Sequence, residues 1–224
     1  MISRYEWRGL LVALALVGCG EDERVPAVAA EQGRIPAERG RIVFLGTSLT
    51  AGLGLDPEKA FPAFIQRKVD SAGLRFEAVN AGVSGESSAG ARRRIDWLLQ
   101  QPVAVLVIET GANDGLRGLK VDSLRANIQA IINRAGRQTP KPAIVLLGMR
   151  APPNLGADYS RAFARVYTEL AKENDVPFVP FLLQGVAGRP SLNQADLIHP
   201  TAKGQQRMAE TVWEVLEPLL KRGA

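Results

Sequence analysis

The chain contains one histidine, His199, in the segment ADLIHPTAKG, and Asp196 precedes it by three residues. A carboxylate at that spacing can accept a hydrogen bond from one imidazole nitrogen, which leaves the other nitrogen free to act as a base. Histidine suits this role because its unperturbed pKa is about 6.5. Taken alone, the fragment is more typical of a surface histidine beside an N-cap aspartate.

Ser48 is the candidate nucleophile, in the segment GTSLTAG directly after the apolar run RIVFLG. A serine on a turn between a strand and a helix can be exposed at the edge of a sheet, near the first amides of the helix. Its hydroxyl attacks an ester carbonyl only when a base lies within hydrogen-bond reach. The alternative interpretation is that Ser48 only caps the helix.

Two further segments carry hydrogen-bond donors. Gly82, in NAGVSGES, can offer a backbone N–H, and Asn113, in ETGANDGLRG, can offer a side-chain amide. Donors of this kind stabilise the negative charge that develops on a carbonyl oxygen during acyl transfer. A turn is the ordinary explanation of each segment.

Short apolar runs precede these residues and predict the strands that position them. The runs are rich in Val, Ile and Leu with little polar alternation, which is typical of strands buried on both faces of a parallel sheet. They span residues 41–46, 76–82, 103–109 and 143–149, with a shorter fifth candidate at 176–182.

Between and after the strands, apolar residues recur at steps of three and four, which predicts helices that pack one face on the sheet. These residues are Val121, Leu124, Ile128, Ile131 and Ile132, then Phe163, Val166, Tyr167 and Leu170, and finally Met208, Val212, Val215, Leu216 and Leu219. The alternation predicts an α/β fold, a three-layer α/β/α sandwich with a central parallel five-stranded sheet. Ligands bind beyond the carboxyl ends of such strands, where the four candidate residues are expected.

In this order and placement, the four segments resemble those of the SGNH, or GDSL-type, hydrolase family, whose blocks contribute Ser, Gly, Asn and His. The resemblance covers residues 41 to 221. The segments GANDGLRG, APPN (151–154) and DLIHPTAKG are most similar to the arylesterase, acyl-CoA thioesterase and lysophospholipase branch. The resemblance implies a flavodoxin-like SGNH hydrolase fold and a serine esterase that works through an acyl-enzyme without a cofactor.

Residue by residue, the resemblance implies a catalytic triad of Ser48, Asp196 and His199. The oxyanion hole would consist of the Ser48 amide, Gly82 and Asn113. One position departs from the pattern, because Thr47 stands where the family usually has an aspartate before the nucleophile. That aspartate is usually thought to brace the loop, and threonine keeps only part of its hydrogen bonding, so we expect lower or altered activity.

Two loops offer apolar side chains that suit a hydrocarbon chain, although ordinary loop packing explains them equally well. The candidates for an acyl groove are Leu53, Leu55, Phe61, Pro152, Pro153 and Leu155.

The N-terminus reads as a targeting segment. Arg4 and Arg8 precede an apolar run, residues 10–17, that is too short to span a membrane. Cys19, the only cysteine, follows a small residue and resembles a bacterial lipoprotein processing site. We therefore predict a signal peptide at 1–18, a lipidated Cys19 with a flexible tether at 19–40, and a hydrolase domain at 41–224. A cleaved signal peptide with an incidental cysteine, or an uncleaved anchor helix, are the alternatives.

The predicted location is the bacterial cell envelope, as a periplasm-facing lipoprotein of the inner or outer membrane. CoA thioesters are cytosolic, so this location favours esters or lysophospholipids as physiological substrates, with thioester cleavage expected only in vitro. A carbohydrate acetyl esterase of the cell envelope and a non-catalytic lipid-binding lipoprotein are the alternative functions.

Composition argues against other classes of site. One histidine, one cysteine and no clustered carboxylates make a zinc site improbable, and no phosphate-binding loop motif occurs. The net charge is a modest +5, and the basic run Arg92–Arg94 lacks interleaved aromatic residues. A solvated helix face or a contact with anionic lipid is therefore expected there, and no nucleic-acid partner.

Overall fold

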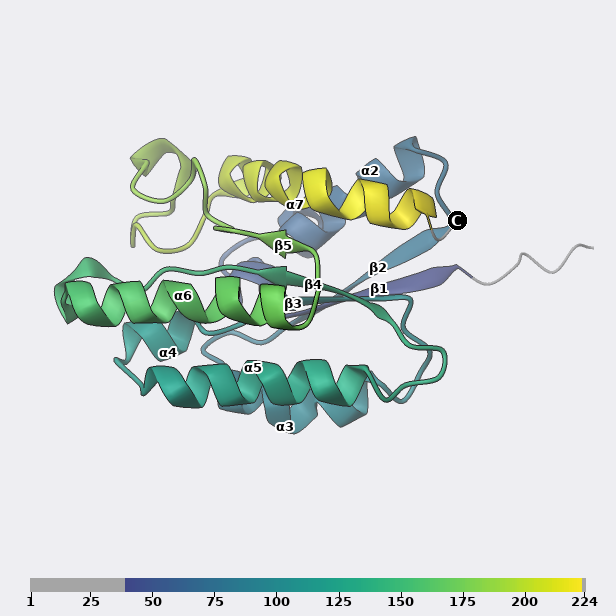
Figure 1. The fold of residues 1–224 in the computed structure, drawn as a ribbon. Helices are drawn as coiled ribbons and strands as arrows, with labels where there is room; N and C mark the ends of the chain where they lie inside the picture. Colours follow the sequence, from purple (N-terminus) through teal and green to yellow (C-terminus); the bar gives the residue numbers. More distant parts are fainter. Residues whose placement is uncertain (1–38, 223–224) are drawn as a thin grey trace, which may run out of the picture. The chain divides into compact units, whose positions relative to one another are not determined.

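Five parallel strands form the centre of the protein (Figure 1). The structure is a computed structural model that describes residues 39–222. The strands are β1 (Gly40–Gly46), β2 (Phe76–Gly82), β3 (Val105–Glu109), β4 (Ala143–Leu147) and β5 (Phe178–Val179), in the order β2-β1-β3-β4-β5. The predicted α/β/α sandwich with five parallel strands is confirmed. The predicted signal peptide, Cys19 and nearly all of the tether lie outside the described residues.

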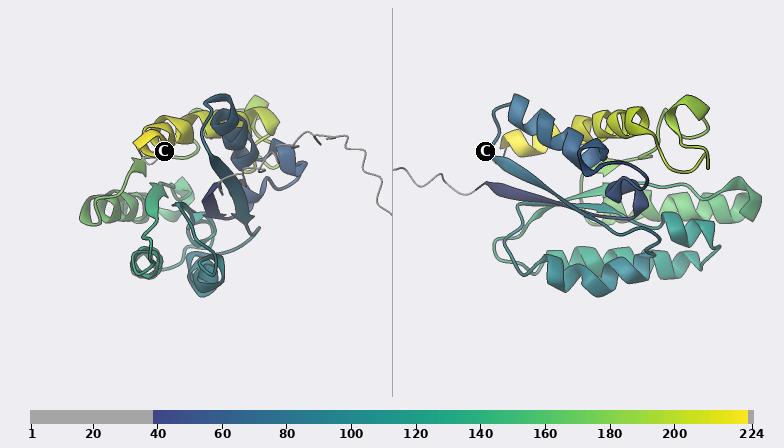
Figure 2. Two further views of the ribbon diagram at one scale, coloured as in Figure 1. Left: turned by 90° about the vertical axis from the view of Figure 1, so that its right-hand side faces the viewer. Right: turned by 180° about the vertical axis from the view of Figure 1, so that it is seen from behind.

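Helices cover both faces of the sheet (Figure 2). Helix α2 (Phe61–Ser71) packs against α7 (Ala202–Arg222) on one face, while α3 (Ser88–Leu98), α5 (Val121–Ala135) and α6 (Ala157–Glu173) cover the other. Two short helices, α1 (Ser48–Ala51) and α4 (Ala112–Leu116), begin directly beyond the ends of β1 and β3. The 3-10 turns are Pro57–Lys59, Pro153–Leu155 and Pro190–Leu192.

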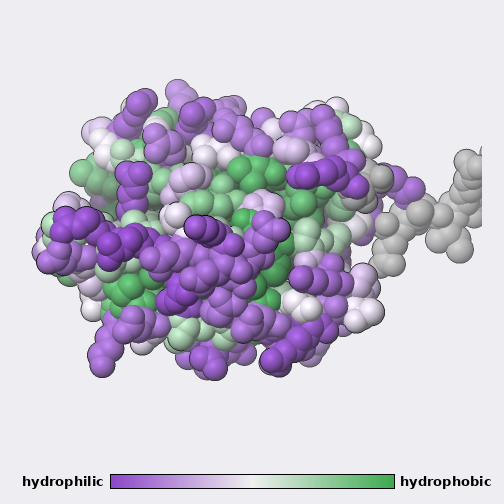
Figure 3. All heavy atoms as spheres, viewed as in Figure 1, coloured by the Kyte–Doolittle hydropathy of each residue, from purple (hydrophilic) through white to green (hydrophobic). Residues whose placement is uncertain are grey.

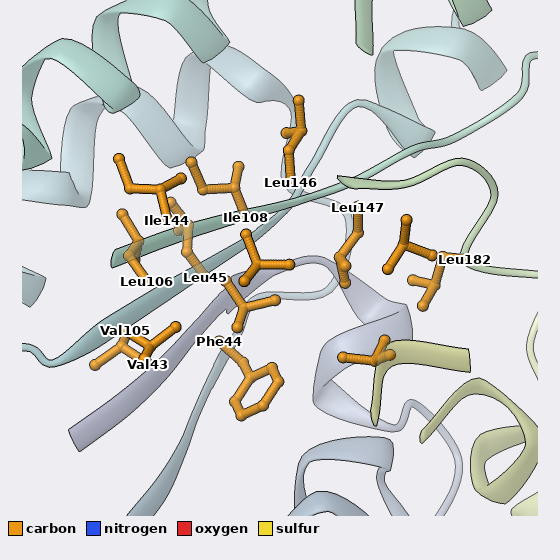
Figure 4. Close-up of a cluster of buried hydrophobic side chains, with 14 of the residues drawn as sticks. Val43, Phe44, Leu45, Val105, Leu106, Ile108, Ile144, Leu146, Leu147 and Leu182 are labelled. Atoms are coloured by element: carbon orange, nitrogen blue, oxygen red, sulfur yellow. The ribbon is translucent and has the colours of Figure 1, made fainter. Parts of the chain in front are cut away.

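The core lies between the central strands and the apolar stripes of the helices. Strands β1, β3 and β4 are almost completely buried, and their side chains alternate between the two faces of the sheet (Figure 4). Leu124 and Ile128 of α5, Phe163 of α6 and Met208 of α7 have no exposed surface. Hydrophilic side chains cover most of the side of the molecule seen in Figure 3, where α6 and α7 both reach the surface. The predicted helical stripes are therefore core-facing.

Two details of the sheet differ from the strands that the sequence predicts. Strand β2 is half-exposed instead of buried on both faces, because it forms the edge of the sheet and pairs only with β1. Strand β5 is reduced to two residues, since Pro177 and Pro180 flank it and proline has no N–H to donate to a strand ladder. The last helix begins at Ala202, two residues after Pro200.

Within residues 39–222, no helix is long and apolar enough to cross a membrane.

Candidate active site

The nucleophile candidate sits on a sharp turn beyond β1. Thr47 has extended backbone angles and caps α1, and Ser48 is the first residue of that helix. The turn is close against β2: a Cβ built on Gly82 would lie 2.2 Å from the amide nitrogen of Ala51. Glycine at position 82 therefore lets the helix that carries Ser48 pack on the neighbouring strand.

His199 joins Ser48 to Asp196. Its Nε2 lies 3.0 Å from Ser48 Oγ, and its Nδ1 lies 2.6 Å from Asp196 Oδ2. The two hydrogen bonds leave Nε2 directed at the hydroxyl while the carboxylate holds the opposite side of the ring. The three residues predicted as a triad are thus brought together, although 151 positions separate Ser48 from His199.

Asp196 is held as an anion. Its pKa is lowered to about 2, first by the hydrogen bond from His199 and then by the backbone amides of His199 and Ile198. Both amides donate to Oδ1 at 2.9 Å, so Oδ2 remains for the imidazole. The tight turn that supplies these amides places Leu197 in the left-handed region, with φ of 59°.

A buried carboxylate, Glu109 at the end of β3, braces the nucleophile turn. Glu109 Oε2 accepts the Thr47 amide at 2.7 Å and the Thr50 hydroxyl at 2.9 Å, and the Thr47 hydroxyl lies 3.0 Å from both carboxylate oxygens. The Thr47 hydroxyl therefore acts as a hydrogen-bond donor that braces the turn. Glu109 was not among the predicted site residues, although a charged residue that closes an otherwise apolar strand is a signal in the sequence.

Glu109 is expected to be essential for the stability of this turn. Gln at position 109 would offer one acceptor oxygen, and its NH2 group would face donors, so at least one buried donor would lose its partner. We expect Glu109→Gln to destabilise the fold by about 1–3 kcal/mol at pH 7. Denaturant unfolding measures this, with exposed Glu77→Gln as the control.

The same experiment has a pH signature. Burial raises the pKa of Glu109, and the amides and hydroxyls of Thr47 and Thr50 oppose this shift. A raised pKa in the folded state makes a contribution to stability that is present at low pH and is lost as pH rises through that pKa. Because glutamine does not titrate, this part of the pH dependence should be absent from Glu109→Gln. Equal pH profiles for the two proteins would contradict the assignment.

Asn113 lies where the family resemblance placed it, beside Ser48 in one cavity. One N–H of its amide donates to the backbone oxygen of Glu86 at 3.0 Å, which orients the side chain and leaves the second N–H for a ligand. Arg94 in turn holds Glu86. Its guanidinium donates three hydrogen bonds to the Glu86 carboxylate and one to the Gly46 oxygen. Arg94 therefore lies in an internal ion pair, whereas the exposed Arg92 and Arg93 match the predicted solvated helix face.

Gly82 does not occupy the predicted position of an oxyanion-hole donor. Its N–H donates to Asn80 Oδ1 at 3.0 Å, and the residue lines a different cavity, between β2 and α3. Gly85, three residues later, lines the cavity of Ser48 and His199. Its φ of 78° suits glycine, and its N–H has no acceptor within residues 39–222. Gly85 therefore replaces Gly82 as the candidate oxyanion-hole donor of this segment, because the turn carries the chain past Gly82 before it faces the site.

Removal of one donor should slow the chemistry selectively. We expect Asn113→Ala to lower kcat for a short-chain ester by about 100- to 1000-fold, because the lost donor acts on charge that develops in the transition state. KM should change little. Steady-state kinetics test this, with Asn154→Ala, on an exposed turn, as the control. An equal fall in activity for both variants would contradict the assignment of Asn113 to the oxyanion hole.

The cavity beside the triad has a volume of about 320 Å³ and is mainly apolar. Of the six predicted groove residues, Leu53 and Pro152 line it. Phe61 does not, because it is fully buried in the core against Phe44. Leu55, Pro153 and Leu155 are also outside the lining. The remaining apolar lining comes from α1, α4 and the segments after β4 and β5, which no local pattern connects: Leu49, Ala112, Leu116, Met149, Leu183 and Ile198.

Among residues 39–222, no three His, Cys, Asp or Glu side chains are grouped so that they could hold a metal ion.

Comparisons with known proteins agree with this geometry. The model of the GDSL-like Lipase/Acylhydrolase family matches residues 44–207. The chain is 40% identical over 180 residues to Esterase TesA of Pseudomonas aeruginosa, covering 80% of this chain and 89% of that protein. It is 36% identical over 181 residues to Thioesterase 1/protease 1/lysophospholipase L1 of Escherichia coli, covering 80% and 84%.

Solved structures support the same relationship. A crystal structure of TesA superposes with a TM-score of 0.76 at 39% identity, covering 80% of this chain and 99% of that one. The psychrotrophic esterase EstA from Pseudoalteromonas sp., in a structure inhibited by monoethylphosphonate, gives 0.75 at 33% identity, covering 81% and 99%. The predicted family and fold are confirmed.

Proposed function

The chain belongs to the GDSL-like lipase/acylhydrolase family and is a hydrolase of ester bonds, and from that premise we propose a serine esterase that cleaves acyl or aryl esters and lysophospholipids. One observation carries the mechanism: His199 lies between the Ser48 hydroxyl and the Asp196 carboxylate, within hydrogen-bond distance of both. That arrangement serves nucleophilic catalysis by a serine.

Acylation begins at Ser48. His199 Nε2 removes the hydroxyl proton as Ser48 Oγ attacks the ester carbonyl, and Asp196 stabilises the imidazolium that forms. The negative charge on the carbonyl oxygen is stabilised by donors from three segments: the Ser48 amide, the Gly85 amide and the Asn113 side chain. Collapse of the tetrahedral intermediate breaks the ester bond, and His199 donates its proton to the departing alcohol.

Deacylation repeats these steps with water as the nucleophile. His199 removes a proton from water, whose oxygen attacks the acyl carbonyl, and the same donors stabilise the second intermediate. When this intermediate collapses, Ser48 Oγ recovers the proton from His199 and the carboxylic acid is released. No step requires a group from outside the chain other than water.

The lining of the cavity supports a hydrocarbon-bearing substrate. Its walls are mostly aliphatic, which suits an acyl chain better than the hydroxyl-rich surface of an acetylated glycan. The relatives include an arylesterase of Vibrio mimicus and the thioesterase and lysophospholipase of Escherichia coli. An intact triad, with Thr47 donating to Glu109, favours catalysis over a lipid-binding role without turnover.

Labelling with a fluorophosphonate ester tests this function. Intact-mass analysis and peptide mapping of the full chain should show one adduct, on Ser48, and Ser48→Ala and His199→Ala should both abolish it. Hydrolysis of p-nitrophenyl esters and of lysophosphatidylcholine by the same preparation then compares the substrates. Well-folded protein that forms no adduct would contradict the proposal, and release of acetate from acetylated glycan alone would favour the carbohydrate esterase.

We also propose that Cys19 anchors the enzyme in the bacterial cell envelope, facing the periplasm. The support is the charged and apolar pattern of residues 1–18 and the placement of the only cysteine. Expression in a bacterium should give a membrane-fractionating protein that incorporates labelled palmitate, and Cys19→Ser should lose the label. Palmitate incorporation by Cys19→Ser, or cytosolic fractionation of the unaltered chain, would contradict the anchor and remove the compartment argument against CoA thioesters.

A further inference from the structure

Exposed apolar side chains gather around the candidate active site. Among residues 39–222, seven large hydrophobic side chains are exposed, and six lie on segments that follow the carboxyl ends of strands. Five of the six, here called the apolar rim, have exposed fractions from 39% to 61%: Leu53, Leu116, Leu119, Leu197 and Ile198. The sixth, Val83, lines the cavity between β2 and α3. The seventh, Trp97, lies near the end of α3, which runs back from the site to the opposite end of the sheet.

The apolar rim is tied together around the cavity. Leu53, Leu116 and Ile198 line the cavity that contains Ser48 and His199. Gln194 Nε2 donates to the Leu53 oxygen at 2.7 Å, and Arg117 Nη2 donates to the Gly85 oxygen at 2.9 Å. The two bonds join these segments in two pairs, and the shared cavity lining brings the pairs together. Leu119 and Leu197 lie on the same segments as Leu116 and Ile198, so the rim borders the mouth of the site.

Leu197 has an unfavourable backbone conformation without compensating burial. Its φ of 59° is in the left-handed region, which glycine and asparagine adopt far more readily than a leucine. Its side chain is 61% exposed, the largest exposed fraction of the rim. Packing within residues 39–222 does not explain a leucine at this position. An exposed leucine here suits contact with a partner.

Cations accompany the rim. Arg117 and Lys120 are exposed beside Leu116 and Leu119, and Arg150, at the cavity, stacks on the Phe181 ring. The acidic side chains of the segments 83–86, 112–120 and 194–199 already have partners: Glu86 binds Arg94, Asp114 binds Ser88 and Asp196 binds His199. Apolar side chains flanked by Arg and Lys, with no free carboxylate in these segments, suit a surface of acyl chains and phosphate headgroups.

We propose that the apolar rim docks on a lipid–water interface. Leu197, Ile198 and Leu116 would enter the acyl region, with Arg117 and Lys120 at the phosphates. An amphiphile could then pass from the interface into the cavity with its chain shielded from water. The choice of a phospholipid-like surface rests on the proposed function, but docking itself requires no turnover.

Vesicle sedimentation tests docking in the full chain carrying Ser48→Ala and Cys19→Ser, so that hydrolysis does not alter the lipid and the proposed Cys19 anchor does not bind it. The rim variant combines Leu119→Gln with Leu197→Gly, two positions outside the cavity lining; glycine suits the backbone angle at 197, so the fold is retained. Trp97→Gln is the control for an exposed apolar side chain elsewhere. Because the N-terminal segment is identical in all proteins, differences report the described domain.

The rim variant should bind vesicles of phosphatidylcholine and phosphatidylglycerol at least 10-fold more weakly, whereas Trp97→Gln should bind like the parent. With Ser48 restored, the rim variant should match the parent on monomeric p-nitrophenyl acetate but fall at least 10-fold on lysophosphatidylcholine micelles. Equal vesicle binding by the parent and the rim variant would overturn docking, as would an equal fall on both esters. A parent that binds through the rim yet leaves lysophosphatidylcholine intact would support docking and contradict only the proposed substrate.

Discussion

Replacement of Ser48 or His199 by alanine is expected to lower kcat for a p-nitrophenyl ester by on the order of 10⁶-fold, and the double variant should lose no more than either single variant. The physical reason is that the 3.0 Å bond between Nε2 and Oγ makes the two side chains one catalytic unit. Without the base the hydroxyl is a poor nucleophile, and without the hydroxyl the base has no proton to remove.

The measurement is a comparison of initial rates for the two single variants, the double variant and Ser84→Ala. Ser84 is an exposed serine in the loop after β2 and should be dispensable. Residual rates above water should persist in all three site variants, because the oxyanion donors remain. Additive losses in the double variant, or substantial activity in His199→Ala, would show that Ser48 and His199 act separately.

Asp196→Asn is expected to lower kcat by about 10⁴-fold while leaving the fold intact. In the structure, Asp196 Oδ1 accepts the amides of Ile198 and His199, and Oδ2 faces His199 Nδ1. Asparagine would keep its oxygen on the two amides, so its NH2 group would face Nδ1. The imidazole would then carry its proton on Nε2, where it could no longer accept the proton of Ser48.

The pH dependence of this loss is also defined. Because the pKa of Asp196 is lowered from 3.8 to about 2, the carboxylate is ionised at every pH above about 4. Its contribution to stability is therefore present above the unfolded value and is lost only as pH falls toward 2. Above the range in which histidine titrates, from about pH 8 to pH 9, the ratio of parent to Asp196→Asn activity should therefore stay constant. Asp158→Asn, which removes an exposed ion pair with Arg161, is the control and should retain full activity; a ratio that varies across this range would contradict the tautomer argument.

Local patterns in the sequence were sufficient for the central sheet, because a buried parallel strand is apolar along its whole length. Residues 41–46 and 76–82 match β1 and β2 to within one residue. The edge position of β2 and the shortness of β5 escaped prediction, since they depend on which strands pair and on the two prolines that flank β5. Strand order is a property of non-local contacts that no segment encodes by itself.

The site residues also divide into those that the sequence predicted and those that only the structure located. Ser48, Asn113, Asp196 and His199 were predicted from residue type, position after strands and resemblance to a family. The structure places Ser48, Asn113 and His199 in the lining of one cavity, with Asp196 bound to His199. Gly82 and Gly85 stand in one short loop, and only the path of the chain showed that the Gly82 amide is already bound to Asn80 while Gly85 faces the cavity.

The sequence alone thus determined the α/β architecture, which follows from local periodicity, and its resemblance to a family predicted the triad from residue types at strand ends. Only the tertiary structure decided that Glu109 supports the Thr47 turn, that Phe61 belongs to the core, and that five exposed apolar side chains surround one cavity. Each of these depends on side chains brought together from segments far apart in the chain. Their contacts are set by how the strands and helices pack, which no local pattern records.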